Sequence, residues 1–518
     1  MTIKLVQHLK WNLRTAILLL VCSAAAFAQP SDRIGYHAIK VDEQGKLLPW
    51  YGNSEAATYD FVVRRLFQFW IRMKPCPNGV PYYLQHQVWK PEEDPRGLGG
   101  DQLNMALSSW NLLYGYLGDP AVRANMIQMA DYWLDHGTSR SDLRWPNLPY
   151  PYNTDVHSGT YDGDMRAGKG YLQPDKAATF GAELLMLYKM TGNRRYLSAA
   201  VKIADTLAHN IQPGDADNSP WPFRVNAETG DVHREADKSG KVWVASYTTN
   251  WTGALRLFAD LAVLRQGDIK NYRRASSIVT AWIKKYPLHT NRWGPFFEDI
   301  PTSVYSDTET NADTLAAHIL EHPDWDPDWK SQAQGILDWS YRTFANHEFD
   351  KLGVTAINEQ TAYTVPGNSH TSRHASVELL ACEKMGSCQN EADIVRRLTW
   401  TTYWVDDDGK NQYPRDDNWL TDGYGDYIRH VLRAMASKAE LAPADQNHLL
   451  RTSSVVQHIE YAADRITYTK FDPHSSERFK LGAAIPKSVT GGTMQWDSAT
   501  RILTVNSACN NVTVFLGK

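Results

Sequence analysis

The sequence predicts a mainly α protein: an (α/α)6 toroid of six helical hairpins followed by a small C-terminal β domain. Helical segments that are apolar on nearly every side alternate with amphipathic ones, and short turns join them. After about residue 440 the chain changes to short β-type runs separated by turn residues, such as "RITYTKFD" and "RILTVNS". We therefore divide the chain into residues 1–28, 29–440 and 441–518.

Four amphipathic segments carry the same apolar stripe. Apolar residues stand at offsets of 0, 4, 7, 8 and 11 from Val122 and again from Tyr196. Smaller residues repeat these offsets from Tyr272 and from Trp329. This spacing places the residues on one face of a helix, so these segments predict half-exposed outer helices.

A short turn precedes each of these amphipathic segments, and the segment before that turn is apolar on nearly every side. Three examples are "LNMALSSWNLLYGYL", "AATFGAELLMLYKM" and "WTGALRLFADLAVL". A helix without a polar face is buried on all sides, so these predict inner helices. Two further pairs join 307–321 with 327–344 and 369–385 with 390–403. Pairing the last buried segment, 424–437, with the first amphipathic one, 55–73, closes the ring.

The predicted connections differ in length at the two ends of the ring. Inner-to-outer turns are short, whereas the six outer-to-inner connections are long: 75–100, 138–174, 212–249, 287–306, 346–369 and 405–422. Long loops of this kind are usually functional or disordered. All six emerge where the inner helices begin, which predicts a funnel above six helix N-termini.

The first residues predict an export signal. Three basic residues precede an apolar run over 16–21, and "AFA" at 26–28 provides a small-residue cleavage site. This pattern is typical of a secretory signal peptide, so we expect an exported protein, either periplasmic or extracellular. No later segment is long and apolar enough to span a bilayer. The formal net charge of −4 and the lack of a basic block argue against nucleic-acid binding.

Four cysteines remain after the leader, and an exported chain permits disulfides. "CEKMGSC" reads as a tight hairpin loop, which favours a Cys382–Cys388 bond. Pairing of Cys76 with Cys509 then follows by elimination.

Each predicted inner helix begins with polar or aromatic residues that could reach the funnel. Asp and Asn are preferred N-caps, and acids there complement the helix dipole, so capping alone explains any one of them. Capping does not require the histidines, arginine and aromatic residues at the same ends. We take as catalytic candidates Asp101, Asp175, His370, Asp422 and Asp426. We take as substrate contacts Tyr247, Asn250, Trp251, Trp293, Glu309, Arg373, His374, Trp419 and Tyr424.

Carboxylates in an aromatic funnel predict sugar chemistry. Glycoside hydrolysis uses one carboxylic acid to protonate the leaving oxygen and a second carboxylate to activate water or attack the sugar. Asp422 and Asp426 are four residues apart, which places them on one helical face. Rings such as Trp251, Trp293 and Trp419 could pack against the apolar faces of sugars. A glycoside hydrolase acting on an oligo- or polysaccharide is the first hypothesis.

Two other functions fit the same funnel. A polysaccharide lyase removes a proton beside a uronic carboxylate, which needs a base such as His370, His374 or Tyr424 and donors for the developing charge. A non-catalytic glycan-binding toroid would bind sugar without forming product. Neither oligomeric state nor the identity of the sugar follows from the sequence.

We expect no metal or cofactor. His370 and His374 stand at i and i+4, but no third ligand accompanies them. "GLGG" before Asp101 follows no predicted strand and has no Gly-Lys-Ser/Thr, so it does not predict a phosphate loop.

The chain resembles the six-hairpin glycosidase superfamily over about residues 50–438. The resemblance is carried by hairpins such as "LYKMTGNRRYLSAAVKIADTL" and by helix openings such as "YTTNWTGALRLFADL". It implies an (α/α)6 fold and a saccharide substrate, because the superfamily includes glycoside hydrolases and toroid polysaccharide lyases. No single family's catalytic signature matches across the chain, so the candidate residues are assigned by position.

Overall fold

The computed structural model describes residues 32–76, 78–84, 100–155, 158–297, 301–412 and 425–517. The predicted leader, residues 1–28, lies outside these ranges. Within them, no helix is both long enough and apolar enough to cross a membrane.

Six helices form an inner ring in the helical part of the chain. Each inner helix contacts the next one in chain order, and the last contacts the first, so the ring is closed. The members are α3 (Gly100–Leu117), α5 (Pro174–Thr191), α7 (Thr252–Leu264), α10 (Glu309–Glu321), α12 (Asn368–Met385) and α14 (Tyr427–Ser437).

An outer helix packs on each inner helix. Five of them follow their inner partner in the chain, whereas the first packs on α14 and α13, as the closing pair of the ring requires. They are α2 (Glu55–Ile71), α4 (Pro120–His136), α6 (Arg194–Asn210), α8 (Ile269–Lys285), α11 (Trp329–Phe344) and α13 (Glu391–Thr402). The predicted (α/α)6 toroid is confirmed.

The hairpin of α5 and α6 shows how the sequence specifies this arrangement. Helix α5 buries nearly every residue, whereas α6 buries one stripe that includes Tyr196, Ala200 and Leu207. Gly192 ends α5 at φ 72°, a left-handed conformation that glycine adopts without steric cost. Asn193 then caps α6 by accepting a hydrogen bond from the backbone N–H of Arg195.

One predicted helix start is displaced, and one candidate cap residue is not a cap. Helix α10 begins at Glu309 rather than at 307, because the Thr308 side chain provides its N-cap. Asp175 is not the cap of α5; it lies within the first turn and is fully buried. Its carboxylate is therefore available for contacts with other helices.

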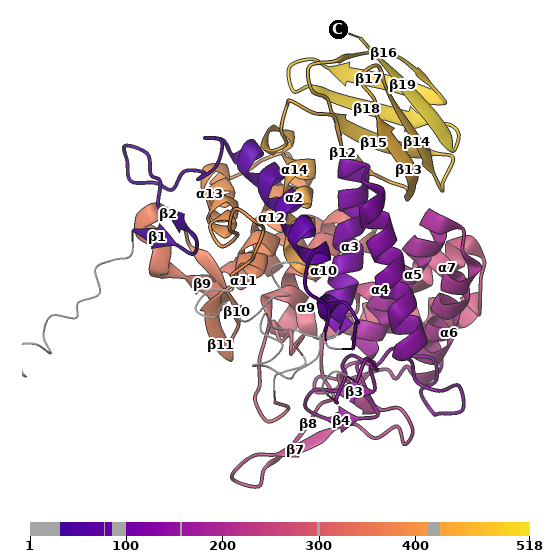
Figure 1. Ribbon diagram of the computed structural model, residues 1–518. Helices are drawn as coiled ribbons and strands as arrows, with labels where there is room; N and C mark the ends of the chain where they lie inside the picture. The colour runs from indigo at the N-terminus through magenta and orange to yellow at the C-terminus, as the bar shows by residue number, and fades with distance from the viewer. Residues whose placement is uncertain are drawn as a thin grey trace, which may run out of the picture.

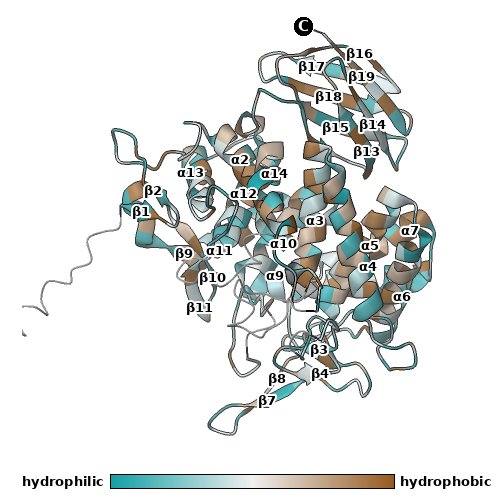
Figure 2. Cartoon of the chain, in the orientation of Figure 1, coloured by the Kyte–Doolittle hydropathy of each residue, from teal (hydrophilic) through white to brown (hydrophobic). Residues whose placement is uncertain are grey.

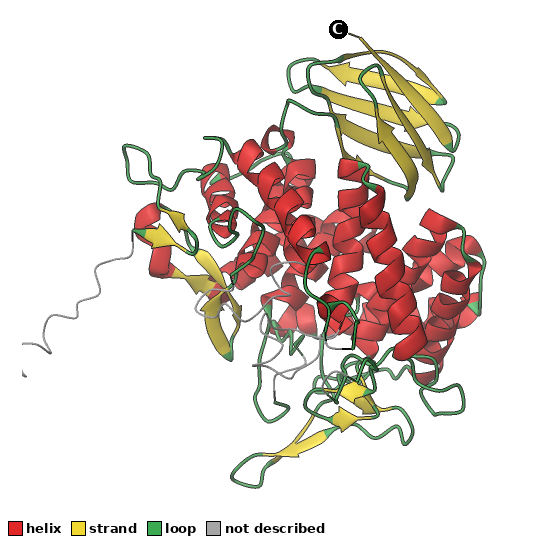
Figure 3. Ribbon diagram, viewed as in Figure 1, coloured by secondary structure: helices red, strands yellow, loops and turns green. Residues whose placement is uncertain are grey.

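Short antiparallel strands shape the long connections. The pairs β3–β4 (Gly163–Asp164 and Gly168–Lys169) and β7–β8 (Arg234–Ala236 and Val242–Val244) lie at the end of the toroid opposite the C-terminal β strands, which form a sandwich of two sheets (Figure 3). The strands are β1 (Arg33–Ile34), β2 (His37–Ala38), β3 (Gly163–Asp164), β4 (Gly168–Lys169), β5 (Tyr171–Leu172), β6 (Val225–Asn226), β7 (Arg234–Ala236), β8 (Val242–Val244), β9 (Ala345–Asn346), β10 (Ala356–Gln360) and β11 (Tyr363–Pro366).

The C-terminal strands form two four-stranded antiparallel sheets. One has the order β12 (His448–Thr452), β15 (Ser475–Lys480), β18 (Ile502–Ser507), β17 (Gly492–Asp497). The other has the order β13 (Val456–Tyr461), β14 (Arg465–Lys470), β19 (Asn511–Gly517), β16 (Ile485–Thr490). Hydrophobic residues gather in the helices and in these strands (Figure 2).

The sandwich is attached to the inner ring at the C-terminal end of α3. The Tyr461 hydroxyl donates to the carbonyl of Gly115 at 2.5 Å and accepts from the backbone N–H of Leu449 at 2.8 Å. A Cβ at Gly115 would lie 3.1 Å from a Leu449 methyl carbon, so glycine allows this close approach. The division into separate domains near residue 440 stays a prediction.

One of the two predicted disulfides is present. Cys382 and Cys388 are bonded. The expected pairing of Cys76 with Cys509 is wrong, because both are free thiols in different surroundings. Cys76 belongs to the hydrophobic core beside the helices, whereas Cys509 is exposed in the turn between β18 and β19.

Candidate active site

The N-terminal ends of the inner helices are joined by polar contacts from one helix to the next. Asn104 of α3 donates to the backbone carbonyl of Lys176 in α5 at 3.1 Å. Ser109 of α3 donates to the carbonyl of Gly425, just before α14, at 2.5 Å. These contacts connect α3 to the N-terminal parts of α5 and α14.

Arg373 of α12 is the centre of a buried polar cluster. Its Nη1 donates to Glu309 of α10 and, at 2.7 Å, to the Thr310 hydroxyl. Its Nη2 donates to Asp426, which immediately precedes α14. All three charged side chains are at least 98% buried. One guanidinium therefore connects three inner helices away from water.

The two carboxyl groups on Arg373 have pKa values that shift in opposite directions. Burial raises the pKa of Glu309 well above its usual range, although Arg373 opposes this shift. Burial also acts to raise the pKa of Asp426, but Arg373, Arg429 and His430 outweigh it and hold that pKa well below its usual range. Glu309 therefore favours the protonated form and Asp426 the ionised form.

Three buried histidines near Arg373 are each hydrogen-bonded to the carboxyl group of an acid. His370 Nδ1 lies 2.5 Å from Glu309 Oε1. His374 Nδ1 lies 2.9 Å from Asp313 Oδ2. His430 Nε2 lies 3.0 Å from Asp426 Oδ1. Carboxylate partners of this kind fix the orientation of an imidazole, as proton transfer requires.

The surroundings shift the pKa values of His374 and His430 in opposite directions. Burial lowers the pKa of His374, but Asp313 and Glu378 outweigh burial, so the net shift is upward. Burial lowers the pKa of His430 well below its usual range despite its bond to Asp426. The surroundings therefore favour the charged form of His374 and the neutral form of His430.

A second polar cluster joins α5 to the start of α7. Asp175 Oδ2 accepts from Lys176 Nζ at 3.1 Å and from Asn250 Nδ2 at 2.9 Å. Lys176 also donates to the Phe296 carbonyl at 2.5 Å and lies 3.5 Å from the centre of its ring. Lys176 is not among the site residues predicted from the sequence. The signal that could have found it is a lysine in the first turn of a segment predicted to be buried on all sides.

The segment 293–297 connects the two clusters. Asn311 of α10 donates to the carbonyls of Trp293, Gly294 and Pro295 at 3.0, 3.1 and 3.2 Å. The ring of Phe297 then lies edge-on to His370, with centroids 5.7 Å apart. Polar groups of the inner helices thus hold this segment in place over the site.

The aromatic residues expected as sugar platforms are mostly core residues. Trp251 and Trp293 are fully buried, and Trp251 Nε1 donates to the Thr248 carbonyl at 2.8 Å. The buried Tyr247 donates its hydroxyl to the Arg292 carbonyl at 2.7 Å. With no ring face open to a ligand, these residues support the loops rather than contact a sugar, which corrects the sequence-based assignment.

Four predicted site residues are not placed by the structure. Trp419, Asp422 and Tyr424 lie outside the described residues. Asp101 belongs to α3, but its side chain is also outside the described part. Their proposed roles stay predictions. Among the residues that the structure does describe, no group of three or more His, Cys, Asp or Glu side chains is placed to hold a metal ion.

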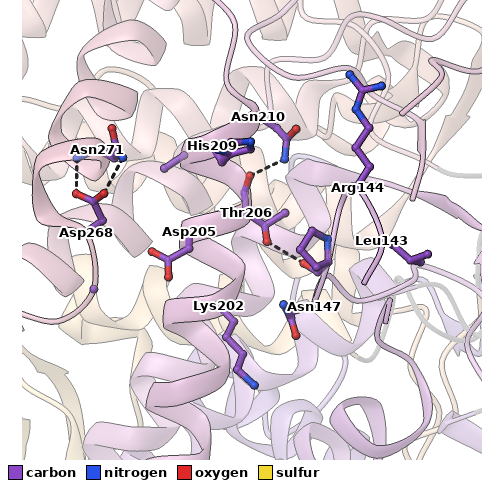
Figure 4. Close-up of a pocket in the computed structure, with 13 residues that line it drawn as sticks. Leu143, Arg144, Asn147, Lys202, Asp205, Thr206, His209, Asn210, Asp268 and Asn271 are labelled. Carbon is purple, nitrogen blue, oxygen red and sulfur yellow. Dashed lines mark hydrogen bonds between the residues drawn. The ribbon is translucent and has the colours of Figure 1, made fainter. Parts of the chain in front are cut away.

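A surface pocket of about 680 Å³ lies elsewhere, beside α6 (Figure 4). Its acids already have partners: Asp205 accepts from the Tyr272 hydroxyl at 2.5 Å, and Asp268 accepts from Asn271 at 2.7 Å. None of the predicted site residues lines this pocket. The buried clusters at the inner-helix N-termini are therefore the better candidate site.

Comparison with solved structures identifies the fold. A cellobiose 2-epimerase from Spirochaeta thermophila matches with a TM-score of 0.54 and 13% identity, over 75% of this chain and 97% of the other. A cellobiose 2-epimerase from Bacillus thermoamylovorans matches with a TM-score of 0.52 and 14% identity, over 73% and 97%. A D-mannose isomerase matches with a TM-score of 0.52 and 10% identity, over 74% and 99%.

The chain has the six-hairpin glycosidase-like fold. No protein-family model matches it, and no curated protein sequence does. A shared fold does not assign a function, so the functional argument depends on the residues of the site.

Proposed function

We propose that this six-hairpin protein is a carbohydrate-active enzyme that hydrolyses a glycosidic bond of an oligo- or polysaccharide. The observation that carries the proposal is the pair of carboxyl groups on Arg373, whose pKa values move in opposite directions. Hydrolysis by two carboxyl groups needs one that is protonated and one that is ionised. Glu309 and Asp426 meet this requirement.

Each residue of the cluster then has a chemical role. Glu309 protonates the leaving oxygen, and its bond to His370 orients it. The ionised Asp426 activates water or stabilises the positive charge that develops on the sugar. Asp175, held by Lys176 and Asn250, orients the substrate. Glu309 thus changes from a substrate contact to the acid, whereas Asp426 keeps its catalytic role.

A second candidate is proton transfer at a sugar carbon. The His370–Glu309 and His374–Asp313 pairs favour it, because an oriented histidine suits removal of a proton beside a carbonyl or carboxylate. The similar structures are named cellobiose 2-epimerase and D-mannose isomerase, which act by rearranging sugars rather than cleaving them. Elimination by a polysaccharide lyase would use the same base.

One assay separates these reactions. The purified chain is incubated in D2O with a panel of neutral and uronic oligosaccharides and polysaccharides. We then measure new reducing ends, ultraviolet absorbance of unsaturated uronates, and deuterium at sugar carbons. Hydrolysis produces reducing ends alone. Deuterium in an unbroken sugar, or an absorbing product, would instead establish the second candidate.

Matched variants test the roles of the two acids. We expect Glu309→Gln and Asp426→Asn each to lower hydrolysis at least 100-fold, because general acid–base groups typically contribute that much. The control is Glu183→Gln, which removes a buried acid paired with Arg256 at 2.7 Å elsewhere on the inner helices. Hydrolysis that survives both site variants would refute the assignment.

We also propose that the protein is exported. The leader pattern predicts this, and the Cys382–Cys388 disulfide supports it, because such bonds persist in oxidising compartments. Mass spectrometry of the protein secreted by its own cells should find an N-terminus near residue 29. An intact leader would contradict it.

A further inference from the structure

A second cavity lies inside the helix ring at the end that carries the β-sandwich. Its volume is about 620 Å³, which suits a sugar-sized ligand. Residues of α3, α7, α10, α12 and α14 form its wall, together with β12 and the turn that follows it. The β-sandwich lies at the opposite end of the toroid from the strand pairs β3–β4 and β7–β8 of the long connections (Figure 1).

The cavity has an excess of available positive charge. Arg433 of α14 and Lys384 of α12 line it, and both are exposed to it. Within the described chain, neither has a carboxylate at ion-pair distance. Two other cations of the wall are already paired, Arg256 with Glu183 at 2.7 Å and Arg451 with Glu383 at 2.7 Å. Among the described lining residues, Glu321 is the single acid.

The environment of Arg433 favours an anionic partner. Its side chain is exposed to the cavity, yet desolvation lowers its pKa, so the surroundings disfavour the isolated charge even though Glu321 opposes the shift. A bound anion would offset that cost. Lys384 lies in the last turn of α12, where a cation complements the helix dipole, so its position has an explanation that needs no ligand. Arg433 lies before the last turn of α14, so the helix dipole does not explain its position, and it is the stronger evidence for a bound anion.

The rest of the wall suits a sugar. The hydroxyls of Thr252, Thr314, Ser376 and Ser453 can exchange hydrogen bonds with sugar hydroxyls, and leucine and valine side chains complete the wall. Mixed linings of this kind bind polar ligands that also have apolar faces.

We propose that this cavity binds an anionic monosaccharide unit, whose carboxylate, sulfate or phosphate group pairs with Arg433 and Lys384. The proposal does not depend on the reaction at the other end of the toroid. Arg373 and His430 line this cavity and also contact Asp426 of the candidate active site. A ligand here would therefore lie directly behind the catalytic cluster.

Isothermal titration calorimetry on the intact protein tests this site. The probes are sodium glucuronate, glucose and sodium sulfate at one ionic strength. We expect glucuronate to bind more tightly than either glucose or sulfate. Each of Arg433→Gln and Lys384→Gln should weaken glucuronate binding about tenfold, the effect of one charge-assisted contact. The control Arg342→Gln changes an exposed arginine of α11 and should leave binding unchanged.

The contrary outcomes are equally specific. Equal binding of glucose, or wild-type affinity in both Arg433→Gln and Lys384→Gln, would overturn the proposal. Sulfate binding as tightly as glucuronate would show a simple anion site and overturn the sugar assignment. Glu309→Gln should keep glucuronate affinity even where it abolishes hydrolysis, so failure of one proposal is distinguishable from failure of the other.

Discussion

The two terminal nitrogens of the Arg373 guanidinium donate to two different acids, Nη1 to Glu309 and Nη2 to Asp426. The two acids lie 117 positions apart in the chain. The three side chains come from three consecutive members of the inner ring. A buried arginine shared by two acids makes the charge of each acid depend on the other. Most of the predictions below depend on this relationship.

Removal of the guanidinium should destabilise the protein. Arg373→Met leaves Asp426 and Glu309 buried without this common partner, which typically costs about 3–5 kcal/mol in the free energy of unfolding. Urea unfolding measures the loss. The control Arg342→Met, at an exposed position, should stay within about 0.5 kcal/mol. A loss below about 1 kcal/mol for Arg373→Met would mean that the guanidinium is not essential to the buried network.

Asp426 should contribute to acid denaturation. Its pKa in the folded protein lies well below the ordinary value of about 3.9. The ionised group therefore stabilises the fold above that ordinary pKa, and the contribution is lost as the pH falls below it. Asp426→Asn should flatten the dependence of unfolding free energy on pH between about pH 5 and pH 2. An unchanged slope would contradict the downward shift.

Glu309 should set the alkaline limit of activity. Its pKa is raised, so it keeps its proton into a higher pH range and loses it as the pH rises through the shifted value. If Glu309 is the acid, kcat/KM falls over that range. The residual activity of Glu309→Gln should lack this alkaline decline, whereas Glu183→Gln should retain it. The same decline in Glu309→Gln would assign it to another group.

Lys176 and Asp175 should be energetically coupled. Lys176→Met and Asp175→Asn each remove one member of a fully buried pair. The double variant should cost less than the sum of the singles by at least about 1 kcal/mol, measured by urea unfolding. The partly exposed pair of Lys284 and Asp326 is the control and should show at most about 0.5 kcal/mol. Strict additivity in the buried pair would exclude the coupling.

The Cys382–Cys388 disulfide should stabilise the folded protein modestly. It closes a short loop, with a sequence separation of 6, so replacing Cys382 and Cys388 together by serine should cost about 2 kcal/mol. Reductant should then have no further effect on thermal unfolding. Cys509→Ser, at an exposed free thiol, should be nearly neutral. Reductant sensitivity in the serine double variant would indicate a different covalent link.

The sequence was informative about helices and much less so about side-chain partners. The stripe beginning at Tyr196 predicted which face of α6 is buried, and the structure confirms it. It also predicted that His370, Arg373 and Asp426 would lie at one end, where they do meet. It could not predict that Trp251 and Trp293 turn into the core, because aromatic side chains in polar loops look alike whether buried or exposed.

The periodicity of the chain by itself determined six pairs of one buried and one half-exposed helix, because the spacing of apolar residues along a helix is local information. The tertiary structure alone decided that one arginine is shared by Glu309 and Asp426, that Lys176 reaches the Phe296 carbonyl, and that Cys76 and Cys509 stay apart. Such contacts depend on the rotation and axial offset of each helix against its neighbours. Those quantities result from packing of the whole core, and no short stretch of sequence encodes them.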